Sequence, residues 1–97
     1  MKKTLFAVLL ATAWPVAAQD AYVIGMSAAM TGPGAGTYAP VVDAMKAYLD
    51  HVNAKGGVNG RQIRLIVQDD GAEPSRAAAN AKKLLAQDKV VMLINTS

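Results

Sequence analysis

The fold is decided by residues 22–53, YVIGMSAAMTGPGAGTYAPVVDAMKAYLDHVN. This stretch opens with an apolar run at residues 22–26 and continues through a loop of glycines and small side chains at residues 31–36. It ends in a segment whose apolar residues recur with helical spacing. A buried strand that leads through a glycine-rich turn into a helix gathers unpaired backbone N–H groups and the positive end of a helix dipole at one place. Such a place favours an anionic group.

The helix after the glycine loop is predicted from the residues at its two ends as well as from the spacing of its apolar residues. Thr37 is suited to cap its first turn, and Pro40 fits that turn because proline needs no hydrogen-bond acceptor there. Gly56 and Gly57 suit a left-handed end. The apolar face is expected to consist of Val41, Met45, Tyr48, Leu49 and Val52.

A turn, two more strands and a second helix follow. Asn59 and Gly60 predict a tight turn. Residues 62–68 predict a strand near a sheet edge, and the wholly apolar residues 90–94 predict another strand. Between these strands, residues 73–75 combine an acid and a proline at a helix start. The apolar stripe of this helix is expected at Ala77, Ala81, Leu84 and Leu85, with Arg76, Asn80, Lys83 and Gln87 facing outward.

The predicted order β-α-β-α-β indicates an α/β fold with a parallel sheet, because each crossover is long enough to return the chain in the same direction. Both crossovers should be right-handed. If the second and third strands flank the first, the first strand is central and the two helices lie on opposite faces. The loops after the first and third strands then flank a topological switch point, where such sheets bind ligands.

The first eighteen residues have the layout of a secretory signal peptide. Two lysines are followed by an apolar run at residues 5–13 and by small residues before Gln19. A membrane-spanning helix needs about 20 apolar residues, whereas residues 5–18 number only 14 and include Pro15. We therefore expect cleavage after Ala18 and a periplasmic location.

The composition of residues 19–97 excludes several classes of function. These residues carry eight basic and seven acidic side chains, a net charge of +1, so nucleic-acid binding is not indicated. The chain has no cysteine, which excludes a disulfide, a thiolate metal site, a catalytic thiol and a lipid-bearing cysteine at the cleavage point. We expect a soluble exported protein. Because these 79 residues are few for an open α/β sheet and end directly after an apolar strand, we expect them to be part of a longer protein.

A nucleotide-binding loop is disfavoured. Gly32 and Gly34 match the first half of G-x-G-x-x-G, but Thr37 occupies the third glycine position and Pro33 lacks an amide donor. No Gly-Lys-Ser/Thr follows, so a P-loop is excluded. Asp69 ends the second strand, as a ribose-binding acid would, but it lies more than thirty residues after Gly34 instead of about 20.

Other chemistry-bearing residues have structural explanations. His51 is the only histidine, and we expect it to be a surface or half-buried residue of the first helix and not a metal ligand or a catalytic group. Asp69 and Asp70 are adjacent at a strand end, where successive side chains point apart, so we expect strand-end and capping roles for them. The sequence therefore predicts no catalytic residue, no metal site and no cofactor.

Three segments resemble the start of a periplasmic solute-binding protein of the branched-chain amino acid type. The most specific is N-A-x-G-G-x-N-G-R at residues 53–61. It is preceded by the Thr31-Gly32 loop and followed by D-D-x-x-x-P at residues 69–74. The resemblance covers essentially all of residues 19–97.

This resemblance implies a type I periplasmic binding protein, a two-lobed clamshell that catches its ligand between the lobes. Residues 19–97 would supply the N-terminal part of the first, three-layer lobe, and the second lobe would lie beyond them. Tyr38 matches the aromatic residue that lines the ligand site, and Thr31 matches a small hydroxyl position there. The implied ligand is an amino acid or related small organic acid or amide, and the implied partner is the membrane permease of an ABC importer.

Two alternatives stay open beside this binding role. A ligand-sensing domain of a receptor shares the fold, and a transmembrane segment after the second lobe would identify it. A nucleotide-using Rossmann-type enzyme is the least favoured. As a separate unit, residues 19–97 would expose the edge of the third strand, and we expect such a fragment to be poorly stable and prone to aggregation.

Overall fold

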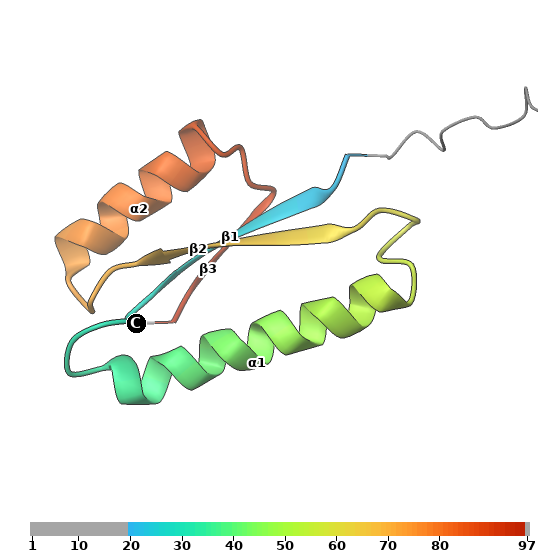
Figure 1. Ribbon diagram of the computed structural model, residues 1–97. Coiled ribbons are helices and arrows are strands. Elements are labelled where there is room, and N and C mark those ends of the chain that lie inside the picture. Colours follow the sequence, from blue (N-terminus) through green and yellow to red (C-terminus); the bar gives the residue numbers. More distant parts are fainter. Residues whose placement is uncertain (1–19, 97) are drawn as a thin grey trace, which may run out of the picture.

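The computed structural model describes residues 20–96, so the predicted leader lies outside the described residues (Figure 1). Five elements follow one another: β1 (Tyr22–Ala28), α1 (Ala35–Ala54), β2 (Ile63–Asp69), α2 (Pro74–Ala86) and β3 (Met92–Asn95). The predicted β-α-β-α-β order is confirmed. Within the described residues, neither helix is both long and apolar enough to cross a membrane.

The three strands form one parallel sheet in the order β2-β1-β3, so the first strand is central, as predicted. β1 pairs with β2 along its whole length, from Tyr22 opposite Ile63 to Ala28 opposite Asp69. On its other side, β1 pairs with the four residues of β3, beginning with Ile24 opposite Met92. Figure 1 shows α1 and α2 on opposite faces of this sheet, which makes three layers.

The main core lies between α1 and the sheet. Met26 and Ala28 of β1 and Val42 of α1 are fully buried. Partly buried side chains complete this cluster, namely Met30, Met45, Leu65, Val67 and Ile94. Burial of one large apolar side chain contributes roughly 1.5–3 kcal/mol, so these residues fix α1 against the strands.

On the opposite face of the sheet, α2 packs against the central strand. Leu84 of α2 is fully buried and lies over Gly25 of β1, beside Val90. A Cβ atom at Gly25 would lie 3.0 Å from side-chain atoms of both Leu84 and Val90. Glycine in the central strand therefore lets α2 approach the sheet.

The first helix begins earlier than predicted. It starts at Ala35 with Gly34 at its N-cap, and no side chain caps it. Thr37 is not the cap, because its N–H already donates to the Gly34 carbonyl at 3.0 Å. Pro40 consequently lies inside the helix, beyond the first turn.

The prediction of the buried face of α1 was partly wrong. Leu49 is buried, but Val41 and Tyr48 are 41% and 63% exposed, and the buried neighbour is Val42. The stripe that faces the sheet runs through Val42, Met45 and Leu49, and this spacing puts Val41 and Tyr48 at its flank.

Two further predictions need correction. Leu85 of α2 is 55% exposed, whereas Asn80, expected outside, is half-buried and turned toward the sheet. The third strand begins at Met92, not at residue 90, and Met92 is 53% exposed. Met92, Leu93 and Asn95 of β3 are exposed, whereas Ile94 packs against the core, and no further strand covers this edge among residues 20–96.

Both predicted turns around α1 and β2 are confirmed. Gly56 and Gly57 have φ values of 103° and 77° after the helix end. Asn59 and Gly60 also have positive φ values, and Val58 and Arg61 exchange two backbone hydrogen bonds across them at 2.8 and 2.9 Å. The segment therefore leads directly back into the sheet.

Candidate functional site

The candidate site lies where the central strand β1 ends and the chain turns into α1. The neighbours of β1 lie on opposite sides of it, and α1 and α2 cover opposite faces. This is the topological switch point that the sequence predicted. Thr31, Gly32 and Pro33 are exposed in the loop at this point.

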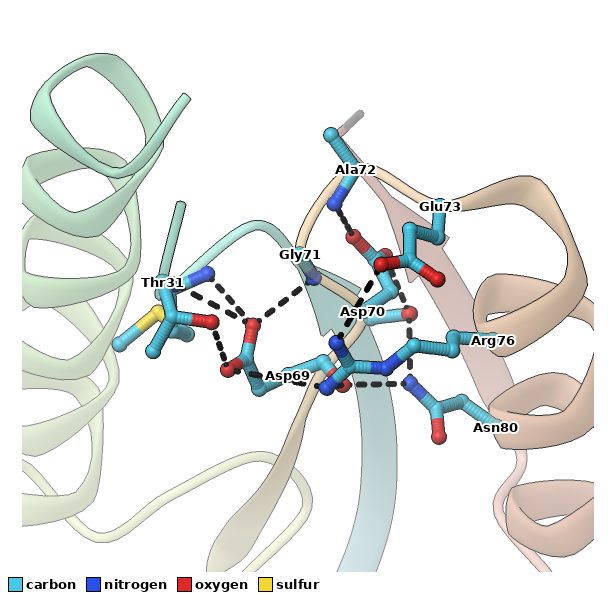
Figure 2. A network of polar contacts seen from close by, with 10 residues as sticks. Thr31, Asp69, Asp70, Gly71, Ala72, Glu73, Arg76 and Asn80 are labelled. Atoms are coloured by element: carbon cyan, nitrogen blue, oxygen red, sulfur yellow. Dashed lines mark hydrogen bonds and ion pairs between the residues drawn. The ribbon is translucent and has the colours of Figure 1, made fainter. Parts of the chain in front are cut away.

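Asp69, the last residue of β2, connects this loop to the neighbouring one (Figure 2). Its Oδ1 accepts hydrogen bonds from the backbone N–H groups of Met30 at 2.9 Å, Thr31 at 3.3 Å and Gly71 at 2.9 Å. Its Oδ2 accepts a hydrogen bond from the Thr31 hydroxyl at 2.6 Å. The carboxylate thus ties the loop after β1 to the loop after β2.

These donors also hold Asp69 in its charged form. The Thr31 hydroxyl is the largest cause that lowers the pKa of Asp69, followed by the N–H groups of Gly71, Met30 and Thr31, and the resulting pKa is about 2. Partial burial opposes this shift. Arg76 lies at the outer side, with its Nη2 4.0 Å from Asp69 Oδ2.

The sequence analysis expected unpaired amides at this loop to favour an anion. The loop does hold an anion, but it is the side chain of Asp69. The same contacts engage the hydroxyl proton of Thr31. Contact between Thr31 and a ligand therefore stays a prediction, and only the oxygen of its hydroxyl is left to accept a hydrogen bond.

Asp70 has a different position from Asp69, as expected for adjacent strand-end residues. It is fully buried, and it accepts hydrogen bonds from the Ser27 hydroxyl at 2.6 Å and the Ala72 N–H at 2.8 Å. Asn80 of α2 donates to Ser27 Oγ and to the Asp69 carbonyl, both at 3.2 Å. Figure 2 shows Asn80 beside this carbonyl. The polar network thereby fastens α2 to the ends of β1 and β2.

Tyr38 lies in the first part of α1, after the glycines of the loop. It is half-buried, and its N–H donates to the Gly34 carbonyl at 3.0 Å. A Cβ atom at Gly34 would lie 3.3 Å from the Tyr38 ring, so glycine leaves room for the ring against the loop. Thr31 and Tyr38 are thus carried by one segment, whose start is held by Asp69.

A separate groove of about 380 Å³ lies between the start of α2 and the end of β3. Its lining is mainly small and apolar, and it includes neither Thr31 nor Tyr38. The lining residues are Ala72, Glu73, Pro74, Ala77, Ala78, Ala81 and Asn95. The groove is therefore distinct from the site that the sequence predicted.

The remaining predicted features can be placed as well. His51 is exposed in the last turn of α1, as expected. Across residues 20–96, no three histidine, cysteine or acidic side chains are grouped in a way that could hold a metal ion. Sequence reasoning missed Ser27 and Asn80, whose contact joins positions 53 residues apart.

Comparisons with known proteins agree with this geometry. A family model described as periplasmic binding protein matches residues 21–97. The Leu/Ile/Val-binding protein of Rhizobium johnstonii is 34% identical over 84 residues, which are 86% of this chain and 23% of that protein.

Two solved structures show the same fold. One is the branched-chain amino acid transporter substrate binding protein of Streptococcus pneumoniae in complex with isoleucine, with a TM-score of 0.73 and 27% identity over 75% of this chain and 21% of that one. The other is the solute binding protein of an ABC transporter from Rhodopseudomonas palustris in complex with 3,4-dihydroxy benzoic acid. Its TM-score is 0.68 and its identity 31%, over 77% of this chain and 20% of that one. The chain spans about a fifth of the length of the relatives it matches.

Proposed function

Because the chain belongs to the periplasmic binding protein family, we propose that it forms the N-terminal part of the first lobe of a solute-binding protein that serves an ABC importer. The ligand is an amino acid or a related small organic acid or amide, captured between this lobe and a second one. The membrane permease of the importer is the partner that receives it. The family is one of binding proteins, so the function involves no catalytic step.

The position of one segment supports this proposal. The central strand leads into a loop that carries Thr31, and the loop leads into the turn of α1 that carries Tyr38. Both residues, which the family resemblance assigns to the ligand site, thus lie at the switch point of the sheet. A ligand held there meets the start of α1, whose dipole contributes roughly 0.3–1 kcal/mol toward a negative group.

The ligands bound by two similar proteins suggest the chemical class of the solute. Isoleucine and 3,4-dihydroxy benzoic acid are bound by proteins similar to this chain, and each has a carboxylate beside an apolar or aromatic body. We infer a small carboxylic acid as the ligand class, with Tyr38 against its body. The second lobe then closes over the ligand and shifts the protein from an open to a closed form.

The predicted leader and the family together support a periplasmic location, with residues 1–18 removed on export. A ligand-sensing receptor domain is the second candidate, since it shares the fold. The distinction lies outside this chain, in a transmembrane segment after the second lobe.

A hybrid protein tests the proposal. Residues 21–96 replace the matching segment of the isoleucine-binding protein from Streptococcus pneumoniae, and isoleucine binding is measured by titration calorimetry. We expect the hybrid to bind isoleucine and Tyr38→Ala to weaken binding about tenfold or more, because an aromatic contact and its buried area are lost. The matched control is Tyr48→Ala, which removes a 63% exposed tyrosine from the same helix.

Two results would count against a ligand role for this segment. One is a folded hybrid that binds no isoleucine, leucine or valine and no aromatic acid. The other is a hybrid in which Tyr38→Ala and Tyr48→Ala have equal effects on the dissociation constant. The thermal unfolding temperature of each variant is measured alongside, so that a loss of binding is separated from a loss of folding.

A further inference from the structure

The carboxylate of Asp69 accepts hydrogen bonds from the donors at the start of the loop after β1. Four donors from two loops converge on one carboxylate: the N–H groups of Met30, Thr31 and Gly71 and the hydroxyl of Thr31. Only the Gly71 contact is local in sequence, since Thr31 lies 38 positions away. The carboxylate therefore joins two segments that the chain itself does not connect closely.

This set of contacts, called here the joint at Asp69, can set the position of the segment that carries Tyr38. It holds the first residues of the loop, and the backbone of the loop is fixed farther on by bonds from Ala35 to Gly32 and from Tyr38 to Gly34. The two loops also approach closely, because a Cβ atom at Gly32 would lie 3.7 Å from the Gly71 carbonyl. Fixing residues 30 and 31 thus fixes where α1 begins.

We propose that Asp69 is a positioning residue of the ligand site, which presets the loop after β1 and presents Tyr38 before any ligand binds. This inference rests on the proposed function. The ligand's own carboxylate then does not bind the amides of residues 30 and 31, because Asp69 engages them. A ligand that binds a preset loop loses less conformational freedom on binding, which raises affinity.

The presetting is tested without ligand, by amide hydrogen exchange of the hybrid protein, in which the segment is completed by the rest of a lobe. The reporters are the Thr31 and Gly71 amides, since the Met30 N–H has a second acceptor in the Ala28 carbonyl at 3.0 Å. We expect both reporters to be protected, and Asp69→Asn to raise their exchange rates about tenfold. Asp50→Asn, which changes an exposed carboxylate of α1, should leave them unchanged. Equal rates in the wild-type hybrid and its Asp69→Asn variant overturn the proposal, as does a folded hybrid whose reporters are unprotected.

The effect on the ligand site is tested in the hybrid protein with isoleucine. Thr31→Val keeps the shape of the side chain and removes its hydroxyl. We expect it to weaken binding about fivefold or more and to lower the unfolding temperature, since a hydrogen bond to Asp69 is lost; binding is therefore measured well below the unfolding temperature of the variant. Thr31→Ser restores the hydroxyl and should restore affinity. Thr37→Val is the matched control, because Thr37 is exposed in the first turn of α1. Unchanged affinity in Thr31→Val overturns the positioning role. A wild-type hybrid without affinity for isoleucine contradicts the proposed function, while the exchange measurement still decides the role of Asp69.

Discussion

Replacement of Gly25 by alanine should destabilise the protein through a single added methyl group. The new Cβ would lie 3.0 Å from one Cδ atom of Leu84, 3.1 Å from the other and 3.0 Å from a Cγ atom of Val90. Carbon atoms pack best at about 3.5–4.0 Å, so three contacts must lengthen together. Leu84 of α2 is fully buried, so it and Val90 have to give way by a few tenths of an ångström in a packed environment. Overpacking of this kind costs about 1–3 kcal/mol of the free energy of unfolding.

Urea unfolding of the hybrid protein, followed by circular dichroism, measures this cost. Gly36→Ala is the control, since a Cβ atom there meets nothing within 4 Å and alanine favours the helix by about 0.5–1 kcal/mol. Leu84→Ala provides a second check. Alone it should cost about 2–5 kcal/mol, but together with Gly25→Ala it should cost less than the sum, because the added methyl occupies space that the leucine leaves. Equal stabilities for Gly25→Ala and the wild type, or strictly additive effects in the double variant, would refute the packing argument.

Two further predictions concern the turn after α1 and the pH dependence of stability. Gly57 and Gly60 both have a φ of 77°, but a Cβ atom at Gly57 would lie 2.0 Å from the Arg61 carbonyl oxygen, whereas one at Gly60 meets nothing within 4 Å. Gly60→Ala should therefore lower the free energy of unfolding in urea by about 1–2 kcal/mol, and Gly57→Ala should lower it clearly more. Equal losses in the two variants would contradict this reasoning. Because the pKa of Asp69 is lowered from 3.8 to about 2 in the folded protein, its contribution to stability is complete above pH 3.8 and is lost as the pH falls toward 2. Asp69→Asn should flatten the decline of the unfolding temperature in this range, and an unchanged acid slope would show that the folded carboxyl has an ordinary pKa.

The strands and their order could be predicted because each strand carries its own signal. Three apolar runs alternate with two helical segments, and the rules for parallel connections then place the first strand in the centre. Asn59 and Gly60 identified the turn for the same reason, since their preference for positive φ acts locally. These features depend on residues that are close in the sequence.

The parts that could not be predicted depend on contacts between distant residues. Val41 and Val42 are equally apolar, and only the position of the sheet decides that Val42 is the buried one. Asn80 is polar and was expected outside, but the end of the sheet offers it two acceptors, Ser27 Oγ and the Asp69 carbonyl. No pattern within one helix reveals such acceptors.

The site was predicted in part. The switch point follows from the strand order, and the resemblance pointed to Thr31 and Tyr38 as ligand contacts, which stay predictions. The sequence did not show that Asp69 would bind the loop amides, because 38 residues separate Asp69 from Thr31. An adjacent pair of acids gives no indication of which carboxylate turns to the neighbouring loop and which is buried.

The joint at Asp69 also bears on how the loop after β1 can change in length among related proteins. The carboxylate accepts hydrogen bonds from residues 30 and 31, at the very start of the loop, and none of the bonds described above for it comes from residues 32–34. Insertions or deletions after Thr31 can therefore reshape the rim of the ligand site while the anchorage to the sheet stays intact. Residues 30 and 31 thus attach the loop to the sheet, while changes at residues 32–34 can alter the ligand site without loosening that attachment.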